Sequence, residues 1–160
     1  MKSLVNYATK GLEAIVVLIL TAMSLLVFVN VVLRYGFHSS INVTEEVSRY
    51  LFVWLTFLGA ILAFGGNQHV KVTMLTDRLS PTKRDILSIV TDGLMLFCCY
   101  LIVQGGWIQF QLNINNLSPI SEIPTGVTFL ASVIAGCVIG ILLLVRIVAT
   151  IRTVAKGESK

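Results

Sequence analysis

Charged residues are scarce in this chain, and their scarcity excludes several classes of protein. Only 12% of its 160 residues are Asp, Glu, Lys or Arg, whereas 56% are hydrophobic. A soluble domain carries about 25% charged residues, so the composition argues against one. The formal net charge is +4, but the basic residues are spread over the segments between apolar runs. This distribution argues against nucleic-acid binding, which needs a concentrated basic surface.

Cysteine is equally sparse. The three cysteines, Cys98, Cys99 and Cys137, all lie inside apolar runs, and the chain has no C-x-x-C motif and no His/Cys cluster. No metal, cofactor or catalytic site is therefore predicted. The cysteine positions also argue against a quinone-linked thiol oxidase. That class of protein also uses four helices, but it needs cysteine pairs in its outer loops. A membrane enzyme of another kind would need a catalytic cluster, which the sequence lacks.

Long apolar runs dominate what is present. They cover roughly residues 12–33, 46–66, 86–108 and 123–145. About 20 residues at ~1.5 Å each cross a hydrocarbon core ~30 Å thick, and only helices satisfy their own backbone there. The first run is too long for a signal peptide, and no A-x-A site follows it. The sequence predicts an all-α membrane protein, with residues 1–160 forming one domain of four transmembrane helices.

Basic residues predict which ends of these helices face the cytoplasm. The amino-terminal segment, the segment between the second and third runs, and the tail hold ten of the twelve, namely Lys2, Lys10, Lys71, Arg78, Lys83, Arg84, Arg146, Arg152, Lys156 and Lys160. The loop at 109–122 has none. Because basic residues concentrate on cytoplasmic loops, both termini are expected in the cytoplasm.

Polar residues cluster where the second helix begins. Glu45 and Glu46 lie three to four residues before Arg49, a spacing at which helical side chains of opposite charge meet. Arg49 lies about one turn inside the apolar run and needs a partner there. Two interpretations stay open. Arg49 is held by its own carboxylates, or it makes a polar contact with another subunit.

Small residues at four-residue spacing let helices approach closely. Gly59 and Ala63 form such a pair in the second run, on a helix whose other candidate contacts are Tyr50 and Trp54. The last run has the strongest small-residue face, which consists of Ser132, Gly136 and Gly140 with Ala131 and Ala135 alongside. That face could pack within the bundle or against a partner, and the sequence leaves both open.

Asp92 is the one carboxylate well inside the third run. A carboxylate in a membrane is costly and marks a functional candidate. It could be neutral, or it could pair with His69 or Arg146 near the same face. A structural or subunit-contact role and a proton or ion relay are both possible.

The segment at 70–79 has apolar residues at helical spacing among charges, which predicts a short amphipathic helix on the membrane surface. Ser80 before Pro81 then resembles an N-cap followed by the first helical position. The third helix is therefore expected to begin before the membrane.

The stretch from Glu45 to Asp77 resembles the DctQ-like family, the small membrane subunits of tripartite ATP-independent periplasmic (TRAP) transporters. The resemblance rests on a Glu-Glu-x-x-Arg-Tyr start, a Trp four residues later, a Phe-x-Gly-Ala segment and a tract that begins at His69 and reaches Asp77. The four-helix layout and chain length extend it over nearly the whole chain.

The resemblance implies a subunit rather than an enzyme, in the bacterial inner membrane. Its partners would be a large membrane subunit that carries substrate and sodium, a periplasmic substrate-binding protein and the phospholipid bilayer. The substrate would be an organic-acid anion such as sialic acid or a C4-dicarboxylate. The absence of broken helices and of a polar midplane site agrees with an accessory role. The alternative is a small multidrug exporter, for which Glu13 is the only candidate carboxylate in the first helix.

Overall fold

Four long helices form nearly all of the computed structural model, which describes residues 2–37, 41–66 and 81–155. They are α1 (Lys2–Gly36), α2 (Asn42–Gly66), α4 (Pro81–Asn113) and α5 (Gly126–Ala155). Each contains a stretch long and apolar enough to cross a membrane. The predicted all-α class with four membrane-crossing helices is confirmed.

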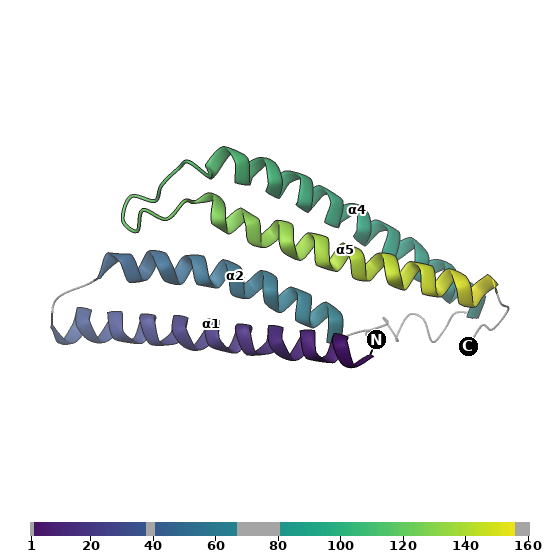
Figure 1. Ribbon diagram of the computed structural model, residues 1–160, viewed down its shortest axis with the longest axis horizontal. Helices are drawn as coiled ribbons and strands as arrows, with labels where there is room; N and C mark the ends of the chain where they lie inside the picture. The colour runs from purple at the N-terminus through teal and green to yellow at the C-terminus, as the bar shows by residue number, and fades with distance from the viewer. Residues whose placement is uncertain (1, 38–40, 67–80, 156–160) are drawn as a thin grey trace.

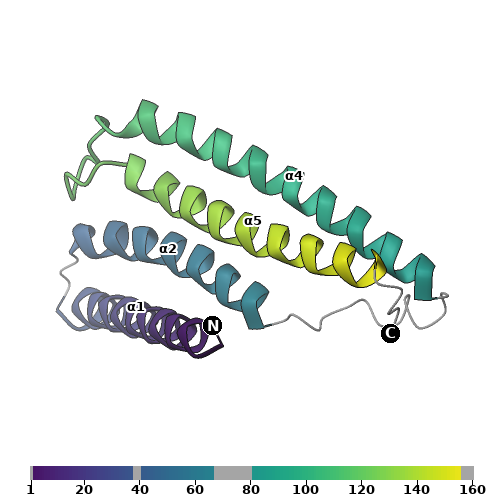
Figure 2. The same cartoon turned by 45° about the vertical axis from the view of Figure 1, so that its right-hand side comes forward.

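The helices lie side by side in the order α1, α2, α5, α4, so that the last two exchange places relative to the chain (Figures 1 and 2). Helices α1 and α2 run antiparallel, as do α4 and α5, whereas the neighbours α2 and α5 run parallel (Figure 1). The amino end of α1 and the carboxyl end of α5 lie at one end of the molecule, here named the terminus end. The opposite end, which carries the α1–α2 and α4–α5 connections, is named the loop end.

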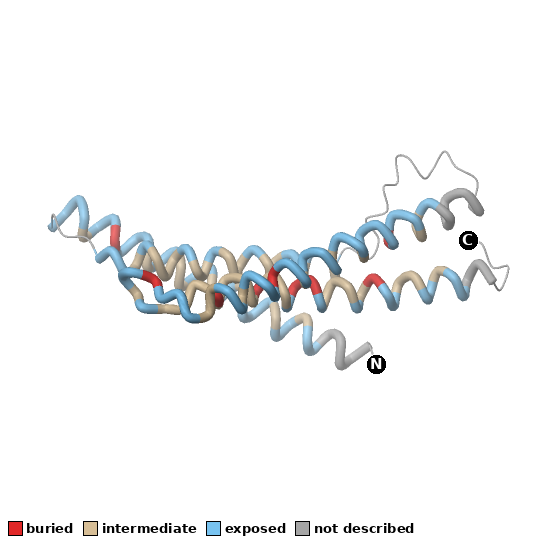
Figure 3. Tube along the Cα trace, turned by 90° about the horizontal axis from the view of Figure 1, so that it is seen from above, coloured by how far each residue is buried: buried red, intermediate tan, exposed pale blue. Residues whose placement is uncertain are grey.

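Burial is concentrated along α5 and its contacts with α4 and α2. In the described part of the chain the buried apolar residues are Ile61, Ala131, Ala135 and Leu143. Figure 3 shows the buried residues as short, scattered segments of helices that are otherwise half-buried or exposed. Side chains of α1 such as Leu18 and Phe28 are 68% and 66% exposed. In a bilayer that surface faces lipid or another protein, because lipid tails are as apolar as the side chains.

Helix α4 begins at Pro81, as the Ser-Pro signal predicts. Proline favours the first helical position, since its fixed φ suits a helix and its missing N–H has no partner there anyway. The amphipathic helix predicted over residues 70–79, like His69, lies outside the described residues.

The connection between α4 and α5 is held in a defined conformation by hydrogen bonds between its own backbone groups. The Ser118 N–H donates to the Ile123 carbonyl at 3.0 Å, and the Thr125 N–H donates to the Asn116 carbonyl at 2.9 Å. Glu122 takes a left-handed φ of 54°, an uncommon conformation for a residue other than glycine. This connection is therefore a folded hairpin, which we name the outer hairpin (residues 114–125).

Candidate functional site

An ion pair joins α4 to α5 toward the terminus end. Arg146 Nε donates to Asp92 Oδ2 at 2.8 Å, and Arg146 Nη2 donates to Asp92 Oδ1 at 2.5 Å. Asp92 is completely buried, whereas the side chain of Arg146 is 38% exposed. Two parallel hydrogen bonds between a guanidinium and a carboxylate add both strength and fixed geometry. Of the partners that the sequence allowed for Asp92, the structure selects Arg146.

The depth of this pair follows from helix length. Asp92 precedes the end of α4 at Asn113 by 21 residues, which is about 31 Å, and Arg146 follows the start of α5 by 20 residues, about 30 Å. Both distances match the ~30 Å thickness of a hydrocarbon core. If a hydrocarbon core ~30 Å thick begins at the loop end, the pair lies near its other boundary rather than at the midplane. This position favours a structural clamp over an ion relay.

The carboxylates at the start of α2 do not hold Arg49, which was the first of its two interpretations. Glu45 lies 3.9 Å from Arg34 of α1, and Glu46 accepts the Ser121 N–H of the outer hairpin at 2.8 Å. Among the described residues, no ion pair involves Arg49, which is exposed. The prediction considered partners on the same helix, whereas α1 and the outer hairpin supply the partners that the structure shows. Of the two interpretations of Arg49, contact with another subunit stays open.

The two small-residue faces have different surroundings. A Cβ added at Gly136 would lie 2.7 Å from Val103 Cγ2 and 3.5 Å from the Cys99 carbonyl oxygen, and one at Gly140 would contact Leu96 and Cys99. Ser132 Oγ lies 2.7 Å from the equivalent point at Gly106. The face of α5 therefore packs against α4 within the chain, which answers the question that the sequence left open.

By contrast, a Cβ at Gly59 would meet nothing within 4 Å among the described residues, and Ala63 is exposed. This small-residue pair of α2 has open space beside it. Tyr50 and Trp54, which the sequence placed on one stripe of the same helix, are both half-buried. The candidate contacts of α2 thus divide into half-buried aromatic residues and an uncovered small-residue pair.

Sequence reasoning missed two residues that organise the packing. Asn30 is buried in α1, and its Oδ1 accepts the Ile41 N–H at 3.3 Å, which ties α1 to the residue before α2. Gly106 is the close-contact point on α4 opposite Ser132. The available signals were an asparagine deep within the first apolar run and a glycine pair within the third.

No group of three or more His, Cys, Asp or Glu side chains that could hold a metal occurs in the described ranges. Glu13, the carboxylate that an exporter would need, is exposed on α1. Together, the geometry defines a flat membrane-embedded helical layer with one charged clamp, a folded outer hairpin and broad uncovered surfaces.

Such a layer suits a transporter subunit, and comparisons with known proteins identify which kind. The sequence profile of the DctQ component of tripartite ATP-independent periplasmic transporters matches residues 23–153. The chain is 56% identical over 160 residues to a TRAP transporter small permease protein of Haemophilus influenzae, covering all of this chain and 99% of that one. The chain belongs to the DctQ family of TRAP transporter small permeases, which are multi-pass inner-membrane proteins.

Two further relatives have names that include a substrate. The chain is 27% identical over 95 residues to the C4-dicarboxylate TRAP transporter small permease DctQ of Vibrio cholerae, covering 59% of this chain and 41% of the relative. It is 29% identical over 92 residues to the sialic acid TRAP transporter permease SiaT of Haemophilus influenzae. That match covers 56% of this chain and 15% of SiaT. Family membership favours the small-permease prediction over the exporter alternative.

Proposed function

We propose that this chain is an accessory scaffold subunit that anchors a large transport subunit in the membrane and helps to dock a periplasmic binding protein. The transported substrate is an organic-acid anion, either sialic acid or a C4-dicarboxylate, and a sodium gradient acting through the large subunit drives its import. The transport site itself belongs to the large subunit.

The observation that carries this proposal is the uncovered flat layer. Asp92 and Arg146 pair with each other between α4 and α5. Broad apolar surfaces of α1, α2 and α4 are exposed. A transporter core needs polar groups around a midplane site, whereas a scaffold needs surfaces for another membrane protein. In SiaT the matching stretch is only 15% of the polypeptide, which supports a larger membrane partner for this chain.

Arg49 is the first residue to test in that partnership, because it is exposed at the membrane boundary and has no ion-pair partner in the described ranges. When an affinity-tagged chain is co-expressed with the large membrane subunit, we expect the two to co-purify. Arg49→Leu should reduce the recovered partner about tenfold, as expected for the loss of a charged hydrogen bond worth ~1.5 kcal/mol or more. Arg49→Lys keeps the charge and should lose less.

Arg34→Gln is the matched control at the same end of the layer, because exposed ion pairs such as Arg34–Glu45 contribute little. Wild-type recovery of the partner with Arg49→Leu would mean that Arg49 faces solvent or lipid headgroups. If the wild-type tagged chain purified without the large subunit, that result would contradict the proposed partnership itself.

The terminus end is proposed to face the cytoplasm, with the outer hairpin in the periplasm, because the terminal and 67–80 segments carry most of the basic residues. A reporter that fluoresces only in the cytoplasm should give signal when fused after Lys160. The same reporter inserted in the outer hairpin between Asn113 and Ser118 should be dark. The reverse pattern would invert the orientation and remove the outer hairpin from consideration as a docking element.

A further inference from the structure

A groove opens between α2 and α5 beside the ion pair. One cavity of about 260 Å³ is lined by Phe64 and Gly65 of α2 and by Leu142, Val145, Arg146 and Ala149 of α5. A second, more open hollow of about 350 Å³ is lined by α5 alone, by Leu144, Val145, Val148, Ala149 and Arg152. The two hollows share Val145 and Ala149, and we name them together the terminal groove. Its walls are mostly apolar, and its basic residues lie toward the terminus end.

Arg146 presents unused donors to this groove. A guanidinium has five N–H groups, of which Asp92 accepts two. The guanidinium carbon also lies 6.0 Å from the centre of the Phe64 ring, which places the charge against α2 as well as α4. Arg146 is therefore fixed in position while it retains capacity for an anion.

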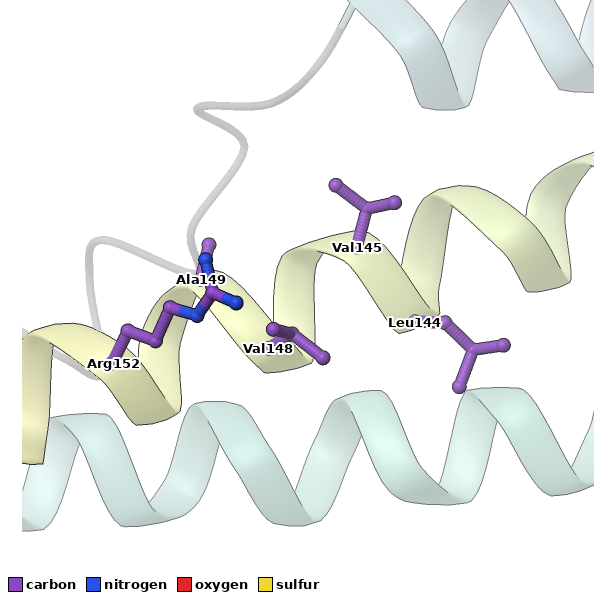
Figure 4. A pocket seen from close by; sticks show the side chains of 5 residues that line it. All are labelled: Leu144, Val145, Val148, Ala149 and Arg152. Atoms are coloured by element: carbon purple, nitrogen blue, oxygen red, sulfur yellow. The ribbon is translucent and has the colours of Figure 1, made fainter.

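Arg152 supplies the second charge. Among the described residues it has no ion-pair partner, and Figure 4 shows its side chain running back along α5 toward Ala149, with Val145 and Val148 farther along the helix. Arg152 follows Arg146 by six residues, or about 9 Å of helix. If the loop end lies at one membrane boundary, Arg146 lies near the other, Arg152 lies farther toward the headgroups, and the apolar wall continues into the hydrocarbon.

We propose that the terminal groove binds one anionic phospholipid, with its phosphate between Arg146 and Arg152 and one acyl chain along Leu142 and Val145. The charges are complementary to an anionic headgroup, and the order of basic and apolar surface matches the order of headgroup and acyl chain. Basic pockets between membrane helices bind anionic headgroups in this way. The lipid would fill the space between α2 and α5 at the terminus end.

The proposal is tested by native mass spectrometry of the purified full chain with equal amounts of phosphatidylglycerol and zwitterionic phosphatidylethanolamine. The wild type should retain one lipid and prefer phosphatidylglycerol about fivefold, the contribution of one basic residue near a membrane surface. Arg152→Gln should abolish the preference. Val145→Trp, which fills the groove and keeps both arginines, should reduce retention of both lipids.

Arg34→Gln removes a charge at the loop end, and Val90→Trp adds the same bulk at a 62% exposed position of α4. Both should behave as the wild type, and circular dichroism should show all four variants folded. Equal retention of the two lipids by the wild type would overturn the proposal and leave the groove to a protein partner. Unchanged preference in Arg152→Gln, or unchanged retention in Val145→Trp, would overturn it as well.

Discussion

Replacing Arg146 with glutamine should lower the unfolding temperature of the purified chain by roughly 10 °C, the largest effect expected of any single change. Asp92 is completely buried and accepts both of its charged hydrogen bonds from Arg146. Removing the arginine leaves a buried charge without compensation, which costs about 3 kcal/mol or more. We expect the opposite single change, Asp92→Asn, to cost less, because the 38% exposed arginine can extend to the interface.

The double variant Asp92→Asn with Arg146→Gln distinguishes a charge effect from simple loss of packing. It contains no unpaired charge, so it should recover at least half of the stability that Arg146→Gln loses. Arg152→Gln removes a charge from an exposed position six residues away and should change the unfolding temperature little. If the double variant were as unstable as the sum of its single changes, the pair would contribute no coupling and would not be a clamp.

Gly136→Leu should separate α4 from α5. A methyl group alone at this position would lie 2.7 Å from Val103 Cγ2, with the Cys99 carbonyl oxygen 3.5 Å away on the opposing backbone. The valine could rotate, but the backbone beyond it cannot yield without moving the helix. Overpacking of this kind costs about 3 kcal/mol, and close packing is a main source of helix association in lipid. The measurement is thermal unfolding together with the yield of monodisperse protein in detergent.

Gly105→Leu is the matched control, since a Cβ added at Gly105 of α4 meets nothing within 4 Å among the described residues. It should unfold at the wild-type temperature or slightly above, because leucine is the better helix former. Gly136→Ala should fall between the wild type and Gly136→Leu. A stable, monodisperse Gly136→Leu would mean that α4 and α5 pack differently from the arrangement described.

The helices could be predicted because their signals are local. Apolar length determines which segments cross the membrane, and Pro81 marks the start of α4 because of proline's own geometry. The small-residue face around Gly136 was also visible in the sequence, since spacing alone brings its members to one side of a helix.

The partners of polar residues could not be predicted, because they depend on which helices are neighbours. Glu45 pairs with Arg34 rather than Arg49 since α1 lies beside α2, and spacing along α2 carries no information about that. The order in which the four helices lie side by side could not be predicted from the sequence for a related reason. In lipid the exposed and packed sides of a helix are equally apolar, so hydrophobicity does not distinguish them. Gly59 and Gly136 look alike in the sequence, yet only Gly136 is packed.

The accessory role is tested most directly by reconstitution into proteoliposomes with an inward sodium gradient. Uptake of labelled sialic acid and of a labelled C4-dicarboxylate would be compared for this chain alone, the large membrane subunit alone, and the two together, each with the periplasmic binding protein outside. The scaffold proposal predicts sodium-dependent uptake of one substrate only when both membrane subunits and the binding protein are present. Sodium-driven uptake by this chain alone would contradict it.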